Sequence, residues 1–188
     1  SQNLTVTGPP GIGKTRLVTE FAAAAESGGA RVVSVAGTIS ERGIALGLVG
    51  ALARALLDLP GAAGISDASM AVLNSVVPSR ATGGTPVVGR PNAAAMGDAL
   101  ADLVDAVAEE NLLLMVVDDL QWADRDSRAL LQRAMRLVPR RPVLLVSTCR
   151  SEEGDREVLR GVMADAERGH TRLLALNPLS EGDVLHVM

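Results

Sequence analysis

Aromatic residues and cysteines are scarce in this 188-residue chain, and each shortage excludes a class of site. Phe21 and Trp122 are the only aromatic residues, so the chain cannot offer rows of stacking platforms for nucleic-acid bases. Cys149 is the only cysteine, which excludes an internal disulfide and a cysteine-based metal cage and suits a cytoplasmic location. The longest apolar run, at 112–117, is too short to cross a bilayer, so we expect no membrane partner.

The length and charge of the chain favour one globular domain. A chain of 188 residues, 47% of them hydrophobic, can bury the core of one α/β domain. The formal net charge is −4 and no basic stripe stands out, so we do not expect this chain itself to bind DNA. A strand-like run follows Ser1 directly, and Met188 falls inside a helix-like pattern. We therefore expect an excised piece of a longer protein.

Short apolar runs alternate with helical patterns along the chain. Such runs are typical of strands buried on both faces of a parallel sheet, and they lie at 4–7, 31–36, 112–117, 143–148 and 173–176. The alternation predicts βαβ units with helices on both faces of the sheet. The fold class predicted is therefore α/β with a mainly parallel five-stranded sheet.

Three helices are predicted from the spacing of their apolar residues. The helix at 15–25 places Leu17, Val18 and Phe21 on one side. The apolar face of the second consists of Met96, Leu100, Leu103, Val104 and Val107. That of the third consists of Leu130, Leu131, Ala134, Leu137 and Val138, with Asp124 or Asp126 as N-cap. The Gly- and Pro-rich range 58–92 predicts an irregular insertion, with a helix near 70–77 and a mobile loop near 80–90.

A phosphate-binding loop is the most specific motif in the sequence. It matches G-x-x-x-x-G-K-[ST] with Gly8, Pro9, Pro10, Gly11, Ile12, Gly13, Lys14 and Thr15. A chance match is the alternative, and the strand before the loop and the helix after it disfavour that reading. We expect these residues and Arg16 to bind ATP or ADP. Lys14 should reach the β- and γ-phosphates, and the Thr15 hydroxyl should ligate Mg²⁺.

A pair of carboxylates ends the most apolar strand, at Asp118 and Asp119. In a parallel sheet such residues reach the edge where ligands bind. We expect Asp118 to hold Mg²⁺, directly or through water, and Asp119 to orient or deprotonate the attacking water. The alternative is an ordinary solvated turn or helix cap. Beside an upstream phosphate loop, the catalytic reading is favoured.

Other polar residues near predicted strand ends allow two readings each. Arg150 follows the strand at 143–148, so it is either a sensor of the γ-phosphate or a surface arginine. Arg140 and Arg141 fit a solvated helix end better than an arginine finger. Asp124 fits a helix cap, and Trp122 fits a packing residue. Cys149 fits a small buried residue. The two histidines, His170 and His186, lack metal-ligand spacing.

Three stretches together resemble STAND-type ATPases, in particular large ATP-binding regulators of the LuxR family. They lie at 8–17, at 116–124 with the residues Asp-Asp-Leu-Gln-Trp-Ala-Asp, and at 146–150; the residues 173–180 also resemble the family's approach to its lid. The resemblance implies a P-loop NTPase three-layer sandwich of the additional-strand class. In that class the 143–148 strand lies between the other two motif strands, which makes Arg150 a sensor-type position.

The resemblance also implies domain boundaries, partner domains and slow hydrolysis. The nucleotide-binding domain would occupy 1–178, and 179–188 would begin a truncated helical lid. Lid and winged-helix domains, ATP-dependent self-association and a distant DNA-binding domain would belong to the full regulator. A family segment that contributes to the adenine pocket would precede Ser1. Asp119 stands where faster ATPases carry Glu, which implies slow hydrolysis.

Several functions remain open on the sequence alone. The first is an ATP-driven switch with slow hydrolysis in a transcriptional regulator. Alternatives are a nucleotide-binding module without hydrolysis, an ATPase module of a kinase or cyclase fusion, a small-molecule phosphotransferase and a ring-forming AAA+ motor. For the phosphotransferase, no positioned base other than Asp119 is found.

We predict that the chain binds Mg-ADP weakly, because the expected adenine pocket is incomplete. Isothermal titration calorimetry measures the dissociation constant directly. A sub-micromolar value would contradict the incomplete pocket.

Overall fold

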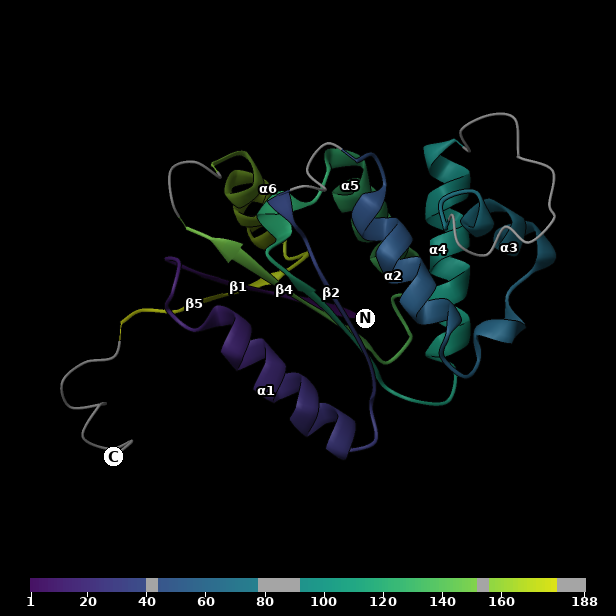
Figure 1. Cartoon of the computed structure of the whole chain (residues 1–188), viewed down its shortest axis with the longest axis horizontal. Helices are drawn as coiled ribbons and strands as arrows, with labels where there is room; N and C mark the ends of the chain where they lie inside the picture. The colour runs from purple at the N-terminus through teal and green to yellow at the C-terminus, as the bar shows by residue number, and fades with distance from the viewer. Residues whose placement is uncertain (40–43, 78–91, 152–155, 179–188) are drawn as a thin grey trace.

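The computed structural model describes residues 1–39, 44–77, 92–151 and 156–178 and contains one five-stranded sheet (Figure 1). Its strands run parallel in the order β2-β3-β4-β1-β5. Their bounds are β1 Gln2–Gly8, β2 Arg31–Ala36, β3 Leu113–Asp118, β4 Val143–Arg150 and β5 Arg172–Ala175. The predicted α/β class is confirmed, and so is the placement of the 143–148 strand between the phosphate-loop strand and the Asp118 strand.

Helices cover the two faces of the sheet unequally. Of the described helices, one face carries only α1 (Lys14–Ser27), which lies below the sheet in Figure 1. The other side carries the remaining helices, with the short α3 against α4. Their bounds are α2 Gly47–Leu57, α3 Asp67–Asn74, α4 Ala93–Val107, α5 Arg125–Leu137 and α6 Arg156–Glu167. Two short 3₁₀ turns complete the described elements, η2 at Ala62–Gly64 and η4 at Leu120–Trp122.

The core is built from aliphatic side chains and lies mostly on the many-helix side. Strands β3 and β4 are buried along nearly their whole length. The edge strands are not, which corrects the prediction of five fully buried strands. Every residue of β5 is exposed, including Leu173 and Leu174, and β2 is mixed. An edge strand has a neighbour on one side only, so apolar composition alone did not identify its place in the sheet.

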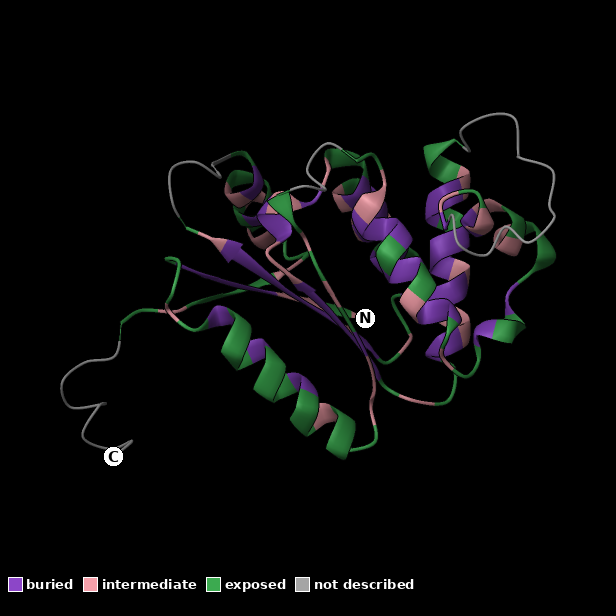
Figure 2. Cartoon of the chain, in the orientation of Figure 1, coloured by how far each residue is buried: buried purple, intermediate pink, exposed green. Residues whose placement is uncertain are grey.

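Two of the three predicted apolar helix faces need correction. The face of α4 is confirmed, since Met96, Leu100, Leu103, Val104 and Val107 are all buried. On α1, Val18 and Ala22 are buried, whereas Leu17 and Phe21 remain 41% and 43% exposed. Figure 2 shows most of the α1 ribbon in the colour of exposed residues. Leu137, in the last turn of α5, is 48% exposed. A single helix on an open face contacts the sheet through a narrow stripe, so neighbouring apolar positions stay in solvent.

Side-chain caps set the starts of three helices. Asp124 is the N-cap of α5, because its Oδ1 accepts a hydrogen bond of 2.9 Å from the Ser127 backbone N–H. Of the two predicted candidates, Asp124 is therefore the cap, and Asp126 lies in the first turn. Ser66 and Asn92 cap α3 and α4 in the same way.

The range predicted as an irregular insertion, 58–92, contains η2 and α3, and α3 begins three residues before the helix expected near 70–77. The predicted loop near 80–90 and the predicted start of a lid at 179–188 lie outside the described residues. In the part of the chain that the structure describes, no helix is long and apolar enough to cross a membrane.

We predict that Leu131→Ala and Leu137→Ala, two identical changes on α5, differ sharply in stability. Leu131 is 4% exposed, so its truncation should lower the free energy of unfolding by about 2–5 kcal/mol. Leu137→Ala should cost less than about 1 kcal/mol, because the side chain is half in solvent. Urea denaturation followed by circular dichroism measures both, and equal losses would contradict the burial assigned to α5.

Candidate functional site

The phosphate loop connects the carboxyl end of β1 to the amino end of α1. Gly11 and Gly13 adopt positive φ angles of 77° and 102°, a region that side chains other than glycine rarely occupy. The Gly13 carbonyl accepts the first helical bond, from Leu17 N at 2.9 Å. The loop therefore turns its backbone around the helix N-terminus, where N–H groups and the helix dipole favour an anion.

Lys14 is buried inside this loop, although it is the only lysine of the chain. Its Nζ donates to the carbonyl oxygens of Gly8 and Pro9, each at 2.9 Å. An ammonium group has three N–H donors, so one remains for an anion in the loop. Pro9, Pro10, Gly11, Thr15 and Arg16 are exposed and Ile12 is half-buried, which leaves the loop open to solvent.

Asp118 joins the start of α1 to the central strand β4. Its Oδ2 accepts a hydrogen bond of 2.8 Å from the Thr15 hydroxyl, and its Oδ1 accepts one of 2.5 Å from the Thr148 hydroxyl. The two residues predicted to hold magnesium are therefore in direct contact. Their oxygen atoms are the kind of ligand that Mg²⁺ prefers, so this pair fits the ion.

Asp119 has a constrained backbone. Its φ of 54° and ψ of 49° lie in the left-handed region, which is uncommon for a residue other than glycine. Its N–H donates to the Thr148 hydroxyl at 2.8 Å. Thr148 thus serves both acidic residues, donating to the Asp118 side chain and accepting from the Asp119 main chain.

Arg150 lies directly beside the phosphate loop, because the register of β1 and β4 pairs it with Gly8. Its Nε is 3.8 Å from Asp119 Oδ1, and its guanidinium carbon is 5.7 Å from the centre of the Trp122 ring. Trp122 therefore packs against an arginine instead of standing open for a base. The loop, both carboxylates and Arg150 thus meet at one edge of the sheet.

Three residues of this edge were not singled out by sequence reasoning. Thr148 was predicted only as part of a strand, and Gln121 only as part of a family stretch. Gln121 donates to Asp119 Oδ1 at 2.7 Å and accepts from the Arg150 backbone N–H at 3.3 Å. A Cβ on Gly37 would lie 2.8 Å from the Asp119 carbonyl oxygen, so this position has no room for a side chain. Thr148 could have been found from the sequence, because it is a hydroxyl residue at the end of a strand expected to lie beside the Asp118 strand.

The remaining candidates are Arg140, Arg141, Cys149 and the two histidines. Arg141 pairs with Asp105 of α4 at 2.5 and 2.7 Å, and these hydrogen bonds raise the pKa of its guanidinium. Arg140 is exposed. Cys149 is fully buried, as predicted. His170 lies at the end of the α6–β5 turn, 4.0 Å from Asp165, and His186 lies outside the described residues.

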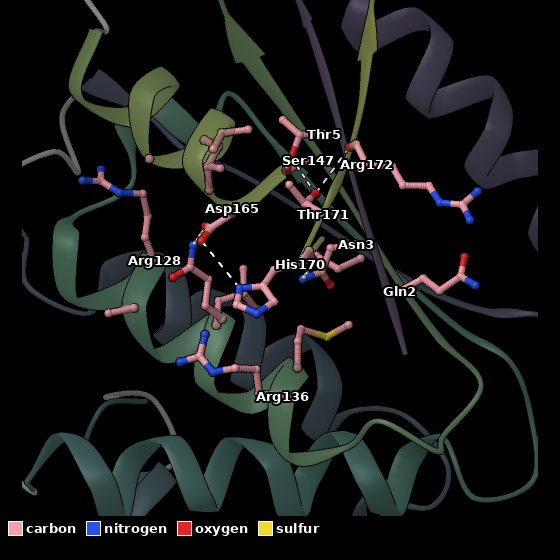
Figure 3. Close-up of a pocket in the computed structure, with 18 of the residues that line it drawn as sticks. Gln2, Asn3, Thr5, Arg128, Arg136, Ser147, Asp165, His170, Thr171 and Arg172 are labelled. Carbon is pink, nitrogen blue, oxygen red and sulfur yellow. Dashed lines mark hydrogen bonds and ion pairs between the residues drawn. The ribbon is translucent and has the colours of Figure 1, made fainter. Parts of the chain in front are cut away.

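A separate cavity of about 680 Å³ lies between α5, α6 and the sheet, toward the amino ends of β1 and β4 (Figure 3). Thr5 and Ser147 form part of its floor and share a hydrogen bond of 2.9 Å. Gln132 and His170 approach Asp165 on its wall. It contains none of the phosphate-loop residues, so it is distinct from the acidic edge of the sheet.

Comparison with known proteins identifies the family. A family model described as AAA ATPase domain matches residues 1–146. The chain belongs to the AAA ATPase domain family. The match includes the phosphate loop, both carboxylates and the first half of β4, whereas Thr148 and Arg150 follow the matched residues. No curated protein sequence matches the chain.

Solved structures agree on the fold of this AAA domain. One is the Aeropyrum pernix ORC2 protein, in ADPNP-ADP complexes, with 17% identity, a TM-score of 0.55, and coverage of 100% of this chain and 44% of that chain. Another is a DNA replication initiation factor, with 12% identity, a TM-score of 0.50, and coverage of 99% and 43%. At these identities the likeness shows the fold alone. The AAA domain spans less than half the length of either protein.

We predict that Thr148→Val lowers the free energy of unfolding by about 1–3 kcal/mol, because Asp119 N–H loses its acceptor and Asp118 loses a donor. Valine keeps the shape of threonine, so the cost reports on the hydroxyl. Thr19→Val on the exposed side of α1 is the matched control and should change stability by less than about 0.5 kcal/mol. If the two variants have the same free energy of unfolding in urea denaturation, the two hydrogen bonds of Thr148 do not contribute to stability.

Proposed function

We propose that this AAA domain binds Mg-ATP and hydrolyses it slowly. The observation that carries the proposal is the meeting of Lys14, Thr15, Asp118, Asp119 and Arg150 at one sheet edge. Lys14 and the loop N–H groups would hold the phosphates. Thr15 and Asp118 would hold Mg²⁺, which supplies positive charge beside the transferred phosphoryl group. Family membership and the ADPNP-ADP complexes of the ORC2 structure support nucleotide as the ligand.

We assign a separate role in ATP hydrolysis to each residue at this edge of the sheet. Water adds to the γ-phosphorus while the bond from that phosphorus to the oxygen leading to the β-phosphate breaks, which gives ADP and inorganic phosphate. Asp119 accepts the proton of the attacking water. Arg150, opposite Gly8 in the register, stabilises charge on the γ-phosphate oxygens and distinguishes ATP from ADP. Asp119 is one methylene shorter than Glu, which favours slow turnover.

We further propose that the domain is the switch of a larger cytoplasmic transcriptional regulator of the STAND and LuxR type. The stretch from Asp118 to Asp124 and the sensor-type Arg150 support this reading. DNA binding, the lid and winged-helix domains, and ATP-dependent self-association would lie in other parts of the protein. The ion pair of Arg141 with Asp105 favours a structural role over an arginine finger, which speaks against a ring-forming motor.

We predict that the wild-type domain releases phosphate from ATP, and that Lys14→Ala and Asp119→Asn both reduce the rate. Lys14→Ala should abolish nucleotide binding, since the only buried cation of the loop is lost. Asp119→Asn should retain binding and lower kcat at least tenfold, because an amide cannot take the proton. Phosphate release and calorimetry with Mg-ATP measure the two effects separately.

The outcomes separate the two leading functions. If the wild type binds nucleotide but releases phosphate no faster than Asp119→Asn does, the domain is a nucleotide-binding module without hydrolysis. Unchanged nucleotide binding in Lys14→Ala would contradict the site itself.

A further inference from the structure

Gln121 is the most deeply buried polar side chain beside the two carboxylates, apart from Thr148. It is 1% exposed, and a buried amide is stable only when its donor and acceptor are both engaged. Its Nε2 donates to Asp119 Oδ1 at 2.7 Å, and its Oε1 accepts from Arg150 N at 3.3 Å. The orientation of the amide is fixed by chemistry, because an ionised carboxylate only accepts and a backbone N–H only donates.

The two oxygens of Asp119 differ as a result. Oδ1 receives the Gln121 hydrogen bond and lies 3.8 Å from Arg150 Nε, which is an ion-pair distance too long for a hydrogen bond. Among the described residues, no hydrogen bond reaches Oδ2. One oxygen is therefore anchored, and the other is available to a water molecule.

The main chain of Asp119 is already fixed by the Thr148 hydroxyl and by its left-handed conformation. With the backbone set, rotation of the side chain about χ1 and χ2 decides where Oδ2 points. The hydrogen bond from Gln121 restrains that rotation. The other end of the same amide accepts from Arg150 N, at the end of β4, the central strand of the sheet.

We propose that Gln121 is a positioning residue that aims Asp119 Oδ2 at the attacking water and links Asp119 to Arg150. The inference rests on the proposed function, since it assigns Gln121 a role in that hydrolysis. Asp119 would then keep its direction even if the Arg150 guanidinium turned to the γ-phosphate. Gln121 does not depend on that guanidinium, because it bonds to the Arg150 main chain.

Two substitutions distinguish the effects of the two hydrogen bonds of the Gln121 amide. Gln121→Glu keeps the size and the acceptor for Arg150 N, and in its ionised form it cannot donate to Asp119. Gln121→Leu keeps approximate size and loses both bonds. We predict that each lowers kcat for ATP hydrolysis at least about tenfold while KM stays within about threefold, because orientation is lost and phosphate binding is not.

A measurement without nucleotide tests the same contacts independently of turnover. In ¹H–¹⁵N spectra, Asp119→Ala should shift the side-chain NH₂ signals of Gln121 and speed their exchange with solvent. Gln121→Leu should shift the backbone signal of Arg150 more than Gln121→Glu does, since only leucine removes its acceptor.

Gln132 provides the matched control, because it is also a glutamine bonded to a carboxylate, that of Asp165, but it lines the separate cavity. Gln132→Leu and Gln132→Glu should leave kcat and the Arg150 signal unchanged. If both Gln121 variants fold and match the wild-type kcat, the positioning role is wrong and the proposed hydrolysis stands.

Other outcomes are equally decisive. A rise in KM at constant kcat would assign Gln121 to substrate binding and overturn the inference. If wild type and Lys14→Ala turn over at the same background rate, the proposed function fails, and this role for Gln121 fails with it. Folding of each variant is checked by its urea midpoint, and Gln121→Glu serves if Gln121→Leu does not fold.

Discussion

The parallel register of three adjacent strands is the constraint on which the rest of the site depends. Strand β4 pairs with β3 on one side and β1 on the other, so the carboxyl ends of all three strands reach the same edge. The pairing of Gly8 with Arg150 follows from this register, as does the reach of Thr148 to Asp118. A shift of β4 by one residue would turn both Thr148 and Arg150 to the other face of the sheet and break these contacts.

The sequence was sufficient for the parts of the fold that repeat a known physical pattern. The phosphate loop has a fixed spacing, and buried strands have continuous apolar runs, so the α/β class and the strand boundaries were predicted within a few residues. The central place of β4 came from the family resemblance and not from the run itself. Strand order is a property of chain crossovers, which leave no local trace in composition.

Other features depend on contacts between distant segments and were missed or wrong. Leu173 and Leu174 form an apolar run like any other, yet β5 is an exposed edge. Gln121 looks like an ordinary polar residue until the fold brings it between Asp119 and Arg150. The predicted roles of Lys14, Asp119 and Arg150 in chemistry stay predictions, because the structure places these side chains together without showing a reaction.

The uneven covering of the sheet gives the two halves of the edge different mechanical support. Thr148, Arg150 and the carboxylates stand on the middle strands, which are packed on both faces. Lys14 and Thr15 stand on α1, the one described helix on its face of the sheet, whose Leu17 and Phe21 remain partly exposed. Helix α1 packs on the sheet through Val18 and Ala22, whereas β4 is hydrogen-bonded to a neighbouring strand on each side. Lys14 and Thr15 are therefore placed by one helix, whereas Asp118 and Thr148 are placed by the two strands at the centre of the sheet.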